Sequence, residues 1–209
     1  MSSLTNFAIN KTIDALYRGQ ALGAPATLYF GLIVATRGYS SNVRSAVVTS
    51  GDTVIPTTPN GHMYRCTTGG TCGSGEPSWP TTSGGTVTDG TAVWTEMTPD
   101  FLANTNLTEA SGGSYARVGV SASLANFAGT QSAGSTAASS GTSGLTSNNG
   151  TITFPPPTAN WGTAAYLGVF DAASSGNLWN AQALTTPQTI NNGASAPTIA
   201  AAAYTEAFT

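Results

Sequence analysis

The sequence predicts a mainly β fold, an antiparallel β-sandwich with one N-terminal α-helix and a small inserted β-module. Three observations lead to this prediction. Apolar residues at helical spacing stand near the start of the chain, short strand-like segments separated by turn residues follow, and the style of the sequence changes between residues 50 and 98. A chain of 209 residues is long enough for one medium domain with a small insert.

The helix is expected over residues 4–18. Ser3 or Thr5 can cap its start, and Gly19 stands where a helix commonly ends. Apolar residues recur every three or four positions and form a stripe along one face: Ile9, Ile13, Leu16 and Tyr17. We expect this stripe to pack on the domain's own sheet, with docking on a neighbouring subunit as the alternative.

The main domain is expected to comprise residues 1–49 and 99–209. Pro25 precedes a strand over residues 26–36, which is nearly all apolar and should be central and buried on both faces. Residues 37–50 and the Gly/Ser/Thr-rich stretch 128–149 are expected to be exposed loops. Further strands, with a hairpin turn at 174–176, are expected at 111–121, 151–154, 163–170, 177–184 and 187–190.

The insert, residues 50–98, is full of turn signals. Pro-Asn-Gly at 59–61 marks a tight turn and Asp-Gly at 89–90 marks a hairpin. Short strands are expected at 53–55, 62–67, 86–88 and 91–97, with Pro99 closing the unit. Its small core would come from Met63, Tyr64, Trp79 and Trp94. Because a core of this size is marginal, packing on the main domain, a disulfide, or both would help.

Two cysteines, Cys66 and Cys72, lie close together in the insert. The Gly-Gly pair between them permits a tight reversal of the chain, so a disulfide is possible. The alternative is two free thiols, kept reduced in the cytoplasm where the chain is made. Two cysteines with one nearby histidine, His62, fall short of a tetrahedral zinc site. We therefore expect no metal and no other cofactor.

The charge content argues against several classes of protein. Only 7% of the residues are charged, against roughly 25% in typical soluble proteins. The six lysines and arginines are scattered, so nucleic-acid binding is not expected. No apolar run reaches membrane-spanning length, and the first residues lack the pattern of a signal peptide. A surface rich in Ser, Thr, Asn and Gly is unusual for an intracellular enzyme but suits a particle protein that neighbouring subunits cover.

The sequence does not predict an enzyme. His62 is the one histidine, and no feature of the sequence singles out an acid to orient it. Acids that could form a glycosidase pair lie in or beside the insert, without a sign that any two share a cleft: Asp52, Glu76, Asp89, Glu96 and Asp100. Contact with a glycan or a partner through Tyr64, Trp79 and Trp94 is the better functional candidate. The alternative is that Trp79 fills the core of the insert.

Four motifs occur in order outside the insert, at 28–32 (LYFGL), 109–117 (EASGGSYAR), 154–162 (FPPPTANWG) and 168–178 (GVFDAASSGNL). Together with the N-terminal helix, they resemble a family of small virion proteins of tailed bacteriophages, usually labelled tail-fibre or minor-tail proteins. The insert is similar in style to small chitin- or cellulose-binding β-modules, and modules like it occur in phage fibre and decoration proteins.

The resemblance implies a structural protein located in the virion and assembled in the bacterial cytoplasm. Its partners would be other copies of itself, by analogy as a trimer, and other virion proteins. As a tail-associated fibre or adsorption subunit, it would anchor through the main domain and direct the insert at the host surface, where a glycan could bind. Alternatively, it would be a capsid decoration protein that stabilises the shell.

Overall fold

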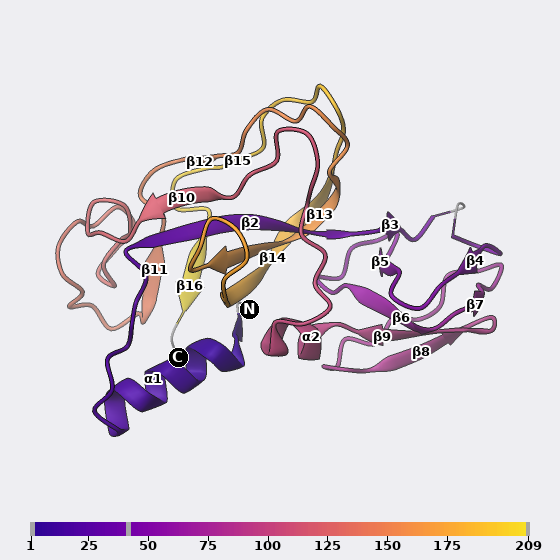
Figure 1. Ribbon diagram of the computed structural model, residues 1–209, viewed down its shortest axis with the longest axis horizontal. Coiled ribbons are helices and arrows are strands. Elements are labelled where there is room, and N and C mark those ends of the chain that lie inside the picture. The colour runs from indigo at the N-terminus through magenta and orange to yellow at the C-terminus, as the bar shows by residue number, and fades with distance from the viewer. Residues whose placement is uncertain (1–2, 41–42, 208–209) are drawn as a thin grey trace.

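The computed structural model describes residues 3–40 and 43–207. Its central element is a five-stranded antiparallel sheet with the strand order β1-β14-β13-β2-β10 (Figure 1). These strands are β1 (Ser3–Leu4), β2 (Thr27–Ala35), β10 (Val118–Ser121), β13 (Gly162–Phe170) and β14 (Leu178–Ile190). The prediction of a mainly β, antiparallel fold with an N-terminal helix is confirmed.

Strand β2 has the position that its apolar sequence predicts. It pairs with β13 on one side and with β10 on the other. Phe30, Leu32 and Val34 belong to the core on one face of the sheet. Ile33 and Ala35 alternate with them and belong to the core on the opposite face, as the two-residue period of a strand requires.

Two short antiparallel ladders cover the first face of this sheet. One pairs β11 (Leu145–Ser147) with β16 (Thr205–Ala207), and the other pairs β12 (Ile152–Thr153) with β15 (Thr198–Ile199). Large side chains fill the space beneath them, among them Phe30, Phe154, Trp161 and Tyr204. The Gly/Ser/Thr-rich stretch is mostly exposed and irregular, as expected, but its end forms β11.

The second face carries helix α2 (Thr98–Ala103) and the small module (Figure 1). Met63, Met97 and Phe101 pack there against Tyr166, whose hydroxyl donates to the Gly61 carbonyl at 2.8 Å. The sequence did not predict α2, because Pro99 was interpreted as the end of the insert. Pro99 instead lies in the first turn of the helix, where its missing N–H costs no hydrogen bond.

The small module is built on a second five-stranded sheet with the order β3-β5-β6-β9-β8, flanked by the pair β4–β7. Its strands are β3 (Arg37–Gly38), β4 (Val47–Val48), β5 (Thr53–Ile55), β6 (Tyr64–Thr68), β7 (Gly70–Thr71), β8 (Thr86–Asp89) and β9 (Ala92–Glu96). The β3–β5 pair is parallel. The expected loop at 37–50 therefore contains two strands, and both pair with strands of the predicted insert. Tyr39, Val43 and Val48 explain this, because they are buried in the module's core.

Strand β14 is continuous where two strands were expected. Its pairing with β13 shifts register between Ala164 and Tyr166, so a bulge absorbs the irregular residues between the two predicted strands. Pro187 lies in this strand without breaking the sheet. Among the described residues, β1 pairs with Asn180 and Ala181 of β14 and no described strand pairs with β14 on that side at Pro187, so no N–H is needed there.

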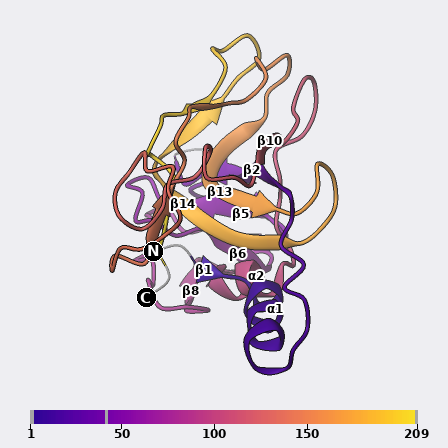
Figure 2. The same ribbon diagram turned by 90° about the vertical axis from the view of Figure 1, so that its left-hand side faces the viewer.

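Helix α1 (Asn6–Tyr17) is the predicted N-terminal helix, capped by the Thr5 side chain, which accepts from the Ala8 N–H. The expectation that its apolar stripe packs on the domain's own sheet is wrong. Exposed fractions rise along the stripe: Ile9 39%, Ile13 45%, Leu16 71% and Tyr17 83%. Only Ala8 of the helix is buried, although the helix neighbours β14 and α2, and Figure 2 shows it below α2.

Candidate functional site

The three rings predicted to contact a glycan or partner lie together in the small module. Trp79 packs on Tyr64, with ring centroids 4.4 Å apart, and edge-on against Trp94 at 6.1 Å. Tyr64 and Trp94 are 0% exposed, so they form the module's core together with Tyr39, Val54 and Cys66. Because an enclosed ring offers no face to a sugar, only the half-buried Trp79 has surface available. Contact with a glycan or partner through Trp79 stays a prediction.

A carboxylate fixes the orientation of Trp79. The indole N–H donates to Glu76 at 2.8 Å, and the same carboxylate accepts from the Thr57 N–H at 2.9 Å. Burial opposes the charge on Glu76, but these hydrogen bonds and Arg44 outweigh it and lower its pKa. Trp79 is therefore both a core residue and a positioned, partly exposed ring.

The two cysteines are free thiols, and the possible Cys66–Cys72 disulfide is not formed in the structure. Both side chains are buried in the module's core. Burial, followed by the neighbouring Asp89 carboxylate, raises the pKa of Cys72 to about 12. Burial also raises the pKa of Cys66. Packing on the main sheet, rather than a disulfide, supports the module.

We expect both thiols to resist modification in the folded protein. A thiol reacts as the thiolate, and buried thiols with raised pKa values form little thiolate at pH 8. Ellman's reagent should therefore react slowly with the native protein and promptly with two thiols after denaturation. A disulfide would leave no reactive thiol even in denaturant, and an accessible thiol would react at once in the native state.

The acids considered for a glycosidase pair each hold the fold together by accepting hydrogen bonds. Asp89 accepts from the Tyr39 hydroxyl at 2.9 Å and from the Gly73 N–H at 2.7 Å. Arg65 donates to both oxygens of Asp100. Asp52 accepts from the Thr49 N–H at 3.0 Å, and Glu76 from Trp79 and Thr57 as above.

Glu96 is the partner of His62 that the sequence did not reveal. Its side chain is fully buried, and its Oε1 lies 2.9 Å from Nδ1 of His62. It also accepts from the N–H groups of Gly84 and Thr98 and from the Thr98 hydroxyl. Strand pairing brings the two residues together, since Tyr64 lies opposite Glu96. Among the described residues, no three His, Cys, Asp or Glu side chains gather as a metal site.

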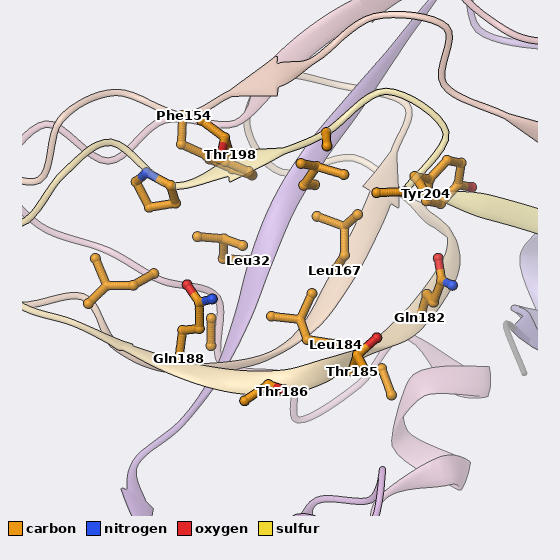
Figure 3. Close-up of a pocket in the computed structure, with 17 residues that line it drawn as sticks. Leu32, Phe154, Leu167, Gln182, Leu184, Thr185, Thr186, Gln188, Thr198 and Tyr204 are labelled. Atoms are coloured by element: carbon orange, nitrogen blue, oxygen red, sulfur yellow. The ribbon is translucent and has the colours of Figure 1, made fainter. Parts of the chain in front are cut away.

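A groove of about 340 Å³ opens between β14 and the β12–β15 ladder. Figure 3 shows Leu32 and Leu167 inside it, Leu184 and Thr186 on the curve of β14, and Phe154 on the opposite wall. Its one titratable side chain is Tyr204, whose pKa burial raises. The groove can therefore hold an apolar group but provides no acid or base. No local sequence pattern indicates this groove, because its walls come from strands that are distant in the sequence.

The motif residues of the main domain converge on a partly buried ion pair. Arg117 donates through Nε and Nη2 to the two oxygens of Glu109, at 2.8 and 2.7 Å. Its Nη1 donates to the carbonyls of Ala172 and Ser175 in the β13–β14 hairpin. The guanidinium lies over the Phe170 ring, 3.5 Å from its centroid. All three nitrogens of this guanidinium thus donate within the fold, which makes the cluster a structural one.

Comparison with known proteins gives one family. The Gp80 family model, described as podophage GP4 fiber I protein gp80, matches residues 81–205. The match runs from the end of the small module through the main domain and includes the motifs at 109–117, 154–162 and 168–178. No curated protein matches the chain. In the part of the chain that the structure describes, no helix has the length and apolar character to cross a membrane.

Proposed function

This chain belongs to the Gp80 family of podophage fibre proteins, and from that premise we propose that it is a tail-associated fibre subunit that contributes to particle assembly and host-surface attachment. The observation that carries the proposal is the family match over residues 81–205, more than half of the chain. Membership of this family indicates a phage structural protein that is located in the virion. Attachment to the host and a position on the tail are the proposed refinements.

The arrangement of the elements supports a division of labour. Helix α1 and the small module extend from opposite ends of the main domain (Figure 1). One end can therefore bind the particle or other subunits while the other faces outward. We propose that the main domain anchors the subunit and that the module, through Trp79 and its Ser- and Thr-rich surroundings, meets a host glycan or a neighbouring subunit.

We also propose that the protein is not an enzyme. The support is that the carboxylates near the module and the Glu109–Arg117 pair already bind donors within the fold. A catalytic acid or base must instead be free to exchange a proton with a substrate. Host polysaccharide incubated with the purified protein should keep its length, and its depolymerisation would refute the proposal.

Immunogold labelling of intact particles with an antibody against this chain tests the position. Labels confined to the tail region, in low copy number, are expected. Labels spread over the capsid at hundreds of copies would refute the tail position and support a decoration protein instead. An unlabelled particle, together with absence of the chain from purified virions, would refute the virion function as a whole.

Replacing Trp79 with Phe tests the role of the module in attachment. Phe keeps a ring in the cluster but removes the indole N–H and part of the exposed surface. We expect slower adsorption of phage that carry this variant, with particle yield unchanged. Adsorption at the wild-type rate would show that Trp79 does not contact the host. Thr67→Ala, a change at an exposed threonine of the same module, is the control and should adsorb normally.

A further inference from the structure

Helix α1 is attached to the protein mainly through its first turns. The Thr5 hydroxyl and N–H donate to the carbonyls of Leu178 and Trp179, at 2.5 and 2.9 Å. Phe7 packs edge-on against the Trp179 ring, with centroids 5.4 Å apart. From there the helix runs away from β14 toward the lower left of Figure 1. Its last turns therefore have little support from the main domain.

The apolar stripe of α1, formed by Ile9, Ile13, Leu16 and Tyr17, becomes more exposed toward this free end, from 39% at Ile9 to 83% at Tyr17. A helix of 12 residues is only marginally stable in water without packing along one face. Large exposed apolar side chains that are contiguous, rather than scattered, mark a surface that another molecule covers. The helix therefore has an exposed apolar face, and covering that face would stabilise the helix.

The charges of α1 lie off the stripe and are satisfied within the helix. Arg18 donates to Asp14 at 2.8 Å, one helical turn away. The Lys11 ammonium lies over the Phe7 ring, 5.9 Å from its centroid. An identical helix that packs on the stripe therefore meets no like charge. A strongly charged partner would find no opposite charge on the stripe to bind.

The spacing of the stripe favours packing between identical helices. Ile9, Ile13 and Leu16 are separated by four and then three residues, the spacing of alternating core positions in a coiled coil. Two such stripes in contact would bury on the order of 1,000 Å², near the lower limit for a specific interface. We propose that α1 joins copies of this chain by packing its stripe against the stripes of other copies. This deepens the proposed fibre function and rests on it, because it names the fibre subunit's partner.

The mass of the full-length protein in solution tests this proposal. Light scattering should give the wild type a mass that is a multiple of 21.0 kDa. The double substitution Ile13→Glu and Leu16→Glu should reduce it to that of the single chain, because two charges on each stripe oppose its burial. Both positions are exposed in the single subunit, and glutamate suits a helix, so the fold should persist with an unchanged melting temperature of the β-domain.

Lys11→Gln is the matched control. It also makes the net charge more negative, but it lies two residues from Ile13 and thus on a different face of the helix. Its mass should equal that of the wild type. A wild type with the mass of one chain at every concentration would overturn the proposal. So would a double variant that retains the wild-type mass.

The fibre function and self-association through α1 can be refuted independently of each other. Gold labelling of virions tests whether the chain is a fibre component at all, whereas the mass of the purified variants tests only the role of α1. A labelled virion with a monomeric wild-type protein in solution would overturn self-association through α1 and leave the fibre function in place. An unlabelled virion would overturn the fibre function, whatever the mass in solution.

Discussion

Replacing Arg117 with Ala should destabilise the main domain by about 3 kcal/mol, the lower end of the cost of removing one partner from a buried ion pair, because the Glu109 side chain is 27% exposed. The arginine side chain is only 6% exposed, and it binds both oxygens of Glu109 and two hairpin carbonyls. Its loss removes two donors from the Glu109 carboxylate, which keeps the Tyr115 hydroxyl at 2.7 Å. It also removes the Arg117 donor from two hairpin carbonyls and uncovers the Phe170 ring. Urea unfolding followed by circular dichroism measures the change in the free energy of unfolding.

Two controls separate the ion pair from a general effect of charge. Arg117→Lys keeps the charge but not the two-pronged geometry, so it should lose an intermediate amount of stability. Arg44→Ala removes an exposed arginine 3.8 Å from Glu76, and a pair of this kind contributes about 0–1 kcal/mol. Equal losses in Arg117→Ala and Arg44→Ala would contradict the structural role of the buried pair.

The Glu109–Arg117 ion pair gives a structural reason for several residues of the motifs found in the sequence. Motifs from residues 28–32, 109–117 and 168–178 meet around one guanidinium. Gly31 and Gly168 lie opposite each other on β2 and β13. A Cβ on Gly31 would come within 2.8 Å of Glu109 Oε1, and one on Gly168 within 2.8 Å of the Phe170 ring. Both positions need glycine because the cluster occupies the space of a side chain.

Prediction from the sequence succeeded where a local signal sufficed. Strand β2 is apolar enough to specify burial on both faces, and Ser-Ser-Gly at 174–176 specifies the hairpin that joins β13 to β14. It was wrong about the expected loop at 37–50, because the polar residues around Tyr39 and Val48 conceal two short strands. These strands exist only through pairing with β5 and β7, which no local pattern encodes.

For the candidate sites too, the sequence predicted which residues matter but not how deeply each one is buried. The aromatic residues of the module were found from the sequence, but the depth at which each ring lies depends on the tertiary fold. Tyr64 and Trp94 are enclosed while Trp79 is not. Similarly, the spacing of the α1 stripe predicted an amphipathic helix. Which side of it faces the protein is decided by the contacts of Thr5 and Phe7 with β14.

Replacing Glu96 with Ala should cost the small module about 3–5 kcal/mol. The carboxylate is 0% exposed and accepts from His62, the Thr98 hydroxyl and two backbone N–H groups. Without it, those N–H groups lose their acceptor at partly buried positions. Tryptophan fluorescence during urea unfolding reports this change, since Trp94 lies in the core of the module and Trp79 against it. Glu206→Ala, at a buried acid of the main domain, is the control and should perturb β16 without selectively unfolding the module.

Glu96 should also make the stability of the module depend on pH. Burial opposes its ionisation, but the hydrogen bonds from His62, Thr98 and Gly84 outweigh burial and lower its pKa. The folded protein therefore binds a proton less readily at this site than the unfolded chain. The stabilisation is complete above the ordinary pKa of glutamate, about 4.3, and is lost as the pH falls through the lowered value. The difference in stability between the wild type and Glu96→Gln should consequently shrink as the pH falls below about 5. Glu76, whose pKa is also lowered, is present in both proteins and cancels in that difference. A difference that stays constant over this range would show that Glu96 is not held in its charged form by the hydrogen bonds around it.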